Sequence, residues 1–248
     1  MSQLVRAELL KVRTTRGWWV YLAVIVLLVG LAVAGDIGSN GDMRSQQDFQ
    51  VGLIESAGFG AVLAMILGIT MVTTEFRHGT ITPTFLAAPS RERVLASKAL
   101  AGTLVFLLFG VLSLLVIAAV ALPWLTITGD EIHFFEGELG TRALETLLSA
   151  VLWGLLGVAI GSVVHSQVAA LVGTLVWIFL VENLIVGLLG LLDSDGVTAY
   201  LPFRALDAAD GTGGDNLISY WPAVAVSLGW IALIGAAGVM RTRRRDIT

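Results

Sequence analysis

The chain has 248 residues, of which 56% are hydrophobic and 14% are charged. An ordinary soluble domain carries about 25% charged residues, because polar side chains must cover its core. The composition therefore excludes a soluble enzyme, a disordered tail and a nucleic-acid-binding module. The chain lacks cysteine, which excludes disulfides and thiolate metal sites, and its three histidines form no metal-binding motif. These features indicate a polytopic membrane protein.

Six apolar runs are long enough to cross a bilayer, whose core of about 30 Å needs about 20 residues of helix. They are too long and too uniformly apolar for the strands of a membrane β-barrel. We therefore predict a single all-α integral membrane domain over residues 1–248, with six transmembrane helices. The predicted spans are residues 18–34, 58–73, 99–122, 147–164, 168–192 and 222–240.

The first apolar run also resembles a signal peptide, because it follows a basic segment and ends in Ala32-Val33-Ala34. Its length exceeds the 7–15 apolar residues, roughly, of a cleavable signal. We therefore expect this run to be retained as the first span.

The distribution of basic residues predicts the orientation. Four basic residues precede the first span, four lie between spans two and three, and four follow the last span, so these segments hold twelve of the fifteen. Because Lys and Arg favour the cytoplasmic side, we expect a multi-pass cell-membrane protein with both termini in the cytoplasm. Fourteen of the nineteen acidic residues lie in the opposite loops, at 35–55, 123–146 and 193–221. The terminal arginines are interpreted as a headgroup anchor, not as a nucleic-acid site.

No motif for catalysis is present. The two lysines, Lys11 and Lys98, follow Leu10 and Ser97, so neither belongs to a P-loop. No G-x-S-x-G arrangement indicates hydrolysis. The chain is therefore predicted not to be an enzyme, and to hold no nucleotide, cofactor or metal of its own.

The connection between spans two and three, residues 74–98, reads TEFRHGTITPTFLAAPSRERVLASK. Gly79 can provide a turn with positive φ, and Phe85 is an apolar side chain in need of a surface. Pro89 and Ser90 predict a break and a helix N-cap, after which a helix runs through Lys98 into the third span. Such a segment is suited to contacting a partner; the alternative is an interfacial helix that lies in the headgroups. The N-terminal segment, residues 4–16, is likewise predicted to be an interfacial helix.

Three segments resemble one family, the ABC-2 type permeases, particularly the forms common in high-G+C Gram-positive bacteria. They are AELLKVRTTRGWW at 7–19, EFRHGTITPTFLAAPSRERVLASK at 75–98, and VENLIVGLL at 181–189 with YLPFRALDA at 200–208. The second is the most specific, and the resemblance covers all six spans. It implies a coupling helix in the 75–98 loop, whose determinants are Glu75, Arg77, Gly79, Thr80, Phe85, Pro89, Arg91 and Lys98.

The resemblance implies a permease subunit of an ATP-driven exporter for a hydrophobic or amphiphilic compound, such as a drug, lipid or peptide-like molecule. A separate P-loop ATPase subunit would bind ATP and Mg²⁺, and a second copy or a homologous permease would complete the membrane part. Two alternatives remain: an ion-coupled secondary carrier that uses Glu182, and a non-transporting membrane scaffold or sensor.

Polar and small residues inside the spans provide further candidates. An acid at the bilayer centre costs about 2.5–3.5 kcal/mol, so Glu182 should face protein or water. Together with Asn183, it either lines a translocation path or makes a structural hydrogen bond. Gly154, Gly157 and Gly161 form a strip that predicts close helix packing.

Overall fold

The computed structural model describes residues 1–15, 17–80, 90–133, 139–192, 195–210 and 218–243. Within these ranges the regular elements are all helical, and six helical segments are long and apolar enough to cross a membrane. This confirms the predicted all-α, six-span membrane architecture. Each expected span falls on one of these segments.

The N-terminal half contains α1 (Ser2–Thr14), α2 (Gly17–Ser39), the 3₁₀ turn η1 (Gly41–Met43), α3 (Gln47–Gly52), the 3₁₀ turn η2 (Leu53–Ala57) and α4 (Gly58–Arg77). The third span is α6 (Arg91–Thr128) and the fourth is α7 (Leu139–Val163). The fifth consists of α8 (Gln167–Val176), the π-helical turn η3 (Trp177–Val181) and α9 (Glu182–Gly190). The 3₁₀ turn η4 (Asp195–Tyr200), α10 (Pro202–Asp210) and α11 (Tyr220–Arg243) complete the described chain.

The helices differ from the predicted spans mainly at their ends. In the third, the helix expected from Arg91 continues into the span without a break, as predicted, and it ends six residues later than residue 122, at Thr128. The fourth and fifth end a little earlier than predicted, at Val163 and Gly190. The loop expected at residues 193–221 contains the short helix α10.

The loop expected at residues 35–55 has local helical structure, because η1, α3 and most of η2 lie there. The buried side chain of Gln50 explains this local structure. Its Nε2 donates to the carbonyl oxygens of Arg44 and Glu131 at 2.7 Å each, and its Oε1 accepts from His133 N at 2.8 Å. Three backbone groups from two connections are thereby satisfied by one amide, which fixes the chain as it enters α4.

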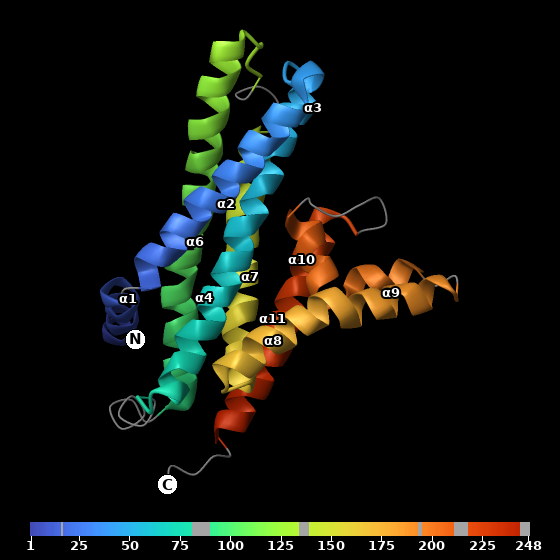
Figure 1. The fold of residues 1–248 in the computed structure, drawn as a ribbon. Coiled ribbons are helices and arrows are strands. Elements are labelled where there is room, and N and C mark those ends of the chain that lie inside the picture. Colours follow the sequence, from blue (N-terminus) through green and yellow to red (C-terminus); the bar gives the residue numbers. More distant parts are fainter. Residues whose placement is uncertain (16, 81–89, 134–138, 193–194, 211–217, 244–248) are drawn as a thin grey trace.

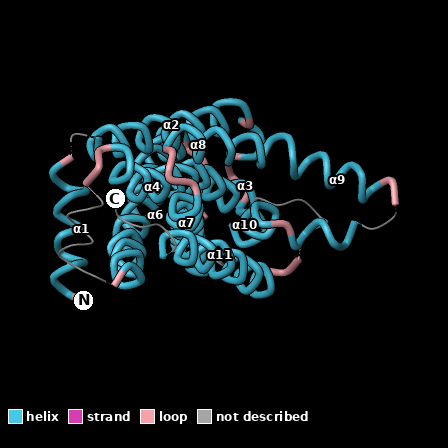
Figure 2. Tube along the Cα trace, turned by 90° about the horizontal axis from the view of Figure 1, so that it is seen from below, coloured by secondary structure: helices cyan, strands magenta, loops and turns pink. Residues whose placement is uncertain are grey.

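Helices α2, α4, α6 and α7 form an elongated bundle, with α10 and α11 beside it (Figure 1). Among the six candidate spans, α7 is the most enclosed and α8–α9 is the least, with α2 and α11 only slightly more enclosed than α8–α9. Both views show α9 projecting away from the bundle (Figures 1 and 2). The bundle is therefore built around α7, and α9 adds little to its core.

The predicted glycine strip lies on α7 and faces α4 and α6. A Cβ on Gly157 would lie 2.1 Å from the carbonyl oxygen of Met65, and one on Gly161 would lie 2.9 Å from that of Ile69. A Cβ on Gly154 would lie 2.3 Å from the ring of Phe106. No side chain fits at these distances, so the backbones of α4 and α7 approach each other directly.

One end of the bundle brings together distant parts of the sequence. Helix α1, the end of α4, the start of α6, the turn between α7 and α8 and the end of α11 all lie there, at the lower end in Figure 1. We call this the terminal end. The predicted coupling residues that the structure describes are therefore gathered at one end of the bundle.

Candidate functional site

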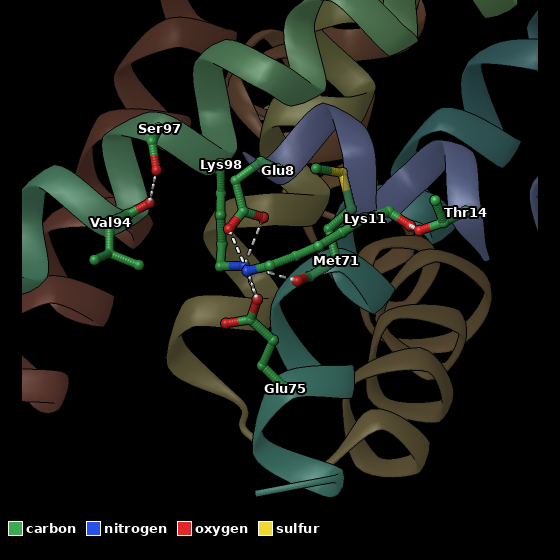
Figure 3. A network of polar contacts seen from close by, with 8 residues as sticks. All are labelled: Glu8, Lys11, Thr14, Met71, Glu75, Val94, Ser97 and Lys98. Carbon is green, nitrogen blue, oxygen red and sulfur yellow. Dashed lines mark hydrogen bonds and ion pairs between the residues drawn. The ribbon is translucent and has the colours of Figure 1, made fainter. Parts of the chain in front are cut away.

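Four charged side chains from three helices meet at the terminal end (Figure 3). Glu8 and Lys11 come from α1, Glu75 from the last turn of α4, and Lys98 from the second turn of α6. We call these four residues the charge cluster. Glu8 and Lys11 share a face of α1, because residues three apart on a helix are neighbours.

Each lysine of the charge cluster contacts both acids. Lys98 Nζ lies 2.9 Å from Glu8 Oε2 and 2.6 Å from Glu75 Oε1. Lys11 Nζ lies 2.7 Å from Glu8 Oε1 and 2.7 Å from Glu75 Oε1. Two positive and two negative charges therefore alternate, and the cluster is neutral as a whole.

Burial makes these contacts essential. The Lys98 side chain is 1% exposed, those of Glu8 and Glu75 are 6% and 9% exposed, and that of Lys11 is 46% exposed. A charge taken out of water costs several kcal/mol unless an opposite charge compensates it. The helices must therefore stay close enough for the pairs to persist.

The choice of lysine suits this geometry. Lys11 and Lys98 are the only lysines in the chain, and the other thirteen basic residues are arginines. An ammonium group is a compact charge with three donors, so it can bridge carboxylates that approach from different helices. Burial alone would lower the pKa of Lys11. Its hydrogen bonds to Glu75 and Glu8, together with their negative charges, outweigh this effect, so the pKa is raised from its ordinary value of 10.5. Lys11 therefore remains charged at neutral pH.

The predicted coupling residues make contacts within the chain. The Glu75 and Lys98 side chains point into the charge cluster. Arg77 Nη1 donates to Gln167 Oε1 at 3.3 Å, which links the end of α4 to the start of α8. Arg91 Nη1 donates to the carbonyl oxygen of Thr242, near the end of α11. The dipole of α11 stabilises a positive charge at this end of the helix.

The remaining residues of this set lie at the edge of the described chain. Gly79 has φ of 68°, the left-handed conformation expected of it, and Thr80 follows it at the surface. Phe85 and Pro89 fall outside the described residues. Ser90 occupies the N-cap position of α6, as predicted, but its side chain makes no capping hydrogen bond.

Glu182 lies at a junction between the fifth span and α10. Its Oε1 accepts from Trp177 Nε1 at 3.2 Å and from the backbone N of Phe203 at 2.9 Å, and Glu182 is 3% exposed. The carboxylate therefore caps the first turn of α10, where free N–H groups favour a negative charge. Asn183 does not assist it: its Nδ2 donates to the carbonyl oxygens of Ile178 and Phe179 on its own helix.

A polar cavity of about 480 Å³ lies at the other end of the bundle, and Glu55, Arg142 and Asp210 are among its lining residues. Asp207 and Asp210 belong to α10, outside the six candidate spans. Burial raises the pKa of the Asp210 carboxyl to about 7, and burial together with the charge of Glu182 raises the pKa of Asp207 to about 6. Within the described ranges, no three His, Asp or Glu residues are arranged to hold a metal ion.

Sequence reasoning missed Glu8 as a site residue and treated Lys11 only as one of the basic residues. The available signal was an acid beside the apolar stripe of an amphipathic helix, three residues before one of only two lysines. The π-helical turn before Glu182 was also missed. Such turns occur frequently at functional sites, but no residue pattern in the sequence predicts this one.

The six-helix architecture is that of a multi-pass membrane protein. Residues 52–248, which are 197 of the 248 residues, match the family described as Protein of unknown function (DUF2705). The chain therefore belongs to this family. The match includes α4 and everything after it, whereas α1 and α2 precede it. No curated protein matches the chain.

Removing Lys98 should destabilise the protein strongly. In Lys98→Met, Glu8 and Glu75 would share only Lys11, and breaking a buried pair in this way costs about 3–5 kcal/mol. Lys11→Met should cost clearly less, because Lys11 is half exposed and Lys98 would still contact both acids. Thermal or chemical unfolding of the purified full chain in detergent measures both effects.

A double-mutant cycle isolates the contact between Lys98 and Glu8. Glu8→Gln combined with Lys98→Met should be less destabilising than the sum of the two single changes, with a coupling energy of about 1–3 kcal/mol. Strict additivity of the two changes would contradict the paired arrangement.

The buried carboxyl of Asp210 predicts a pH dependence. Its pKa of about 7 lies above the ordinary 3.8, so between these values the folded state holds a proton that the unfolded state releases. Stability should therefore fall as pH rises from about 4 to 7. Asp210→Asn should flatten this part of the curve of melting temperature against pH. An unchanged slope in the variant would assign the dependence to other groups.

Proposed function

We propose that this chain is the membrane-spanning permease subunit of an ATP-driven exporter of the ABC-2 type. In this proposal a separate P-loop ATPase docks on the cytoplasmic side, at the terminal end, and binds ATP and Mg²⁺. A second copy of the chain, or a homologous permease, completes the membrane part. The sequence resemblance at 75–98 is the origin of the proposal, and the six apolar helices are compatible with it.

The observation that carries the proposal furthest is the charge cluster. Glu75 and Lys98 bound the segment with the most specific resemblance, and both side chains contact α1. A force applied to this segment would therefore reach three helices at once: α1, α4 and α6. Such an attachment is what a coupling segment needs, because a loop that moved alone would leave the spans unchanged.

The proposed cycle follows from linkage. ATP binding closes the pair of ATPase subunits, and their movement displaces the 75–98 segment. Because the charge cluster joins this segment to α1, α4 and α6, the displacement biases the spans toward another access state. Arg77 and Arg91 extend the connection to α8 and α11 through Gln167 and Thr242.

The contacts of Glu182 favour this mechanism over an ion-coupled carrier. A coupling acid must exchange protons or ions with a path through the membrane. The carboxylate of Glu182 is instead almost fully buried, and one of its oxygens accepts hydrogen bonds from Trp177 and Phe203. This arrangement suits a residue that positions α10 against the fifth span. The few charges within the spans favour a hydrophobic or amphiphilic cargo, and the family resemblance implies that this cargo is exported.

The test is purification of the tagged chain from its native host in mild detergent, followed by mass spectrometry of the proteins that accompany it. We expect a stoichiometric P-loop ATPase. Arg93→Glu should reduce its recovery by about fivefold or more, because Arg93 is exposed at the start of α6, where its charge can contribute to a docking surface.

Arg142→Glu is the matched control, since Arg142 lies on the first turn of α7 at the other end of the bundle. It should leave recovery of the ATPase unchanged. Absence of any ATPase in several mild detergents would overturn the proposal. A stable ATPase complex whose hydrolysis responds to no amphiphile would favour a scaffold or sensor instead.

A further inference from the structure

We propose that the cavity between α1, α2 and α4 binds an anionic phospholipid of the surrounding bilayer, with an acyl chain inside and the phosphate at Lys11. This cavity, which we call the terminal cavity, has a volume of about 580 Å³. That is within the range of about 300–1,000 Å³ typical of small-molecule sites. The proposal stands independently of the transport function, because it concerns binding alone.

The shape of the terminal cavity fits a chain-like ligand. Its α4 wall extends from Leu67 to His78, eleven residues of helix or about 16 Å along the axis. Its α2 wall runs beside this, from Gly17 at the start of the helix to Tyr21. The cavity therefore lies lengthwise along the bundle, as an acyl chain in a membrane does.

The polarity of the lining changes along this length. The inner part is formed by Leu67 and Met71 with the rings of Trp18 and Tyr21, and its two hydroxyl groups, on Tyr21 and Thr70, are hydrogen-bonded to each other at 3.3 Å. The part nearest the end of α4 is polar, with His78 and Gln167 among its residues. An amphiphile with its head at the terminal end would match both parts, whereas a wholly polar or wholly apolar ligand would match only one.

The accessible charge at the polar part is positive. Glu8 and Glu75 also line the cavity, but their side chains are buried and each contacts both lysines. Lys11 is half exposed, and its ammonium group has three hydrogens, of which two are donated to Glu8 and Glu75. The third can be donated to a phosphate oxygen. The geometry therefore favours an anionic head over a cationic one, which would face Lys11.

The test uses the purified full chain, delipidated in mild detergent, with lysophosphatidylglycerol and lysophosphatidylcholine as probes. Both have one acyl chain and a phosphate, but only the first has a net negative charge. Native mass spectrometry and thermal-shift titration measure the binding of each. We expect the anionic probe to bind at least about fivefold more tightly.

Two glycines of α2 provide a matched pair of variants. A Cβ at Gly17 or at Gly35 meets nothing within 4 Å, so a side chain can begin at either position without displacing a neighbour, but of the two only Gly17 lines the terminal cavity. Gly17→Phe should weaken binding of the anionic probe by about tenfold or more, the equivalent of about 1.4 kcal/mol. Gly35→Phe should leave it unchanged.

A charge variant tests the head position without removing a member of the charge cluster. Gln167→Glu adds a negative charge at the polar part and keeps the side-chain size. It should therefore weaken the binding of lysophosphatidylglycerol and leave the binding of lysophosphatidylcholine unchanged. Equal binding of the two probes to the wild type, or equal loss in Gly17→Phe and Gly35→Phe, would overturn the proposal.

Discussion

Lys98 is a charged side chain at the start of a transmembrane helix, almost entirely removed from solvent. Its charge is tolerable there only because Glu8 and Glu75 lie within 2.9 and 2.6 Å of its ammonium group. Glu8 and Glu75 in turn share Lys11. The cost of burying any one of these charges is offset only when α1, α4 and α6 are all in place. The packing of the N-terminal helix on the bundle therefore depends on electrostatics as well as on apolar contact.

A different constraint holds the centre of the bundle. Along α7 the glycines allow the α4 backbone to approach without intervening side chains, so these two helices form a close-packed pair with little freedom to slide. The fifth span is attached differently. Helix α9 leaves the bundle (Figure 2), and Glu182 connects its start to α10 through the N–H of Phe203. The molecule thus combines a rigid pair, α4 and α7, with a fifth span held at fewer points.

The six spans could be predicted from the sequence because the thickness of the bilayer determines how long an apolar run must be to cross it. The glycine strip could be located for a similar reason, since its spacing places the residues on one helix face. The charge cluster could not be predicted in this way. Glu8, Glu75 and Lys98 are separated by 67 and 23 positions, and nothing local to Glu75 indicates that it turns inward toward α1. Its resemblance to a family motif directed attention to the right segment, but the contact with Glu8 required the packed helices. Gln50 is a similar case, because its partners belong to two connections with no regular pattern.

The most direct test of the charge cluster is the reactivity of the two lysines. With no other lysine in the chain, treatment of the protein in membranes with an amine-acylating reagent, followed by peptide mass spectrometry, reports each side chain separately. The structure predicts that Lys11 reacts readily, that Lys98 reacts at least about tenfold more slowly because it is exposed only on local opening, and that Glu8→Gln accelerates the reaction of Lys98. Equal rates for both lysines in the wild type, or a Lys98 rate unaffected by Glu8→Gln, would contradict the four-residue cluster.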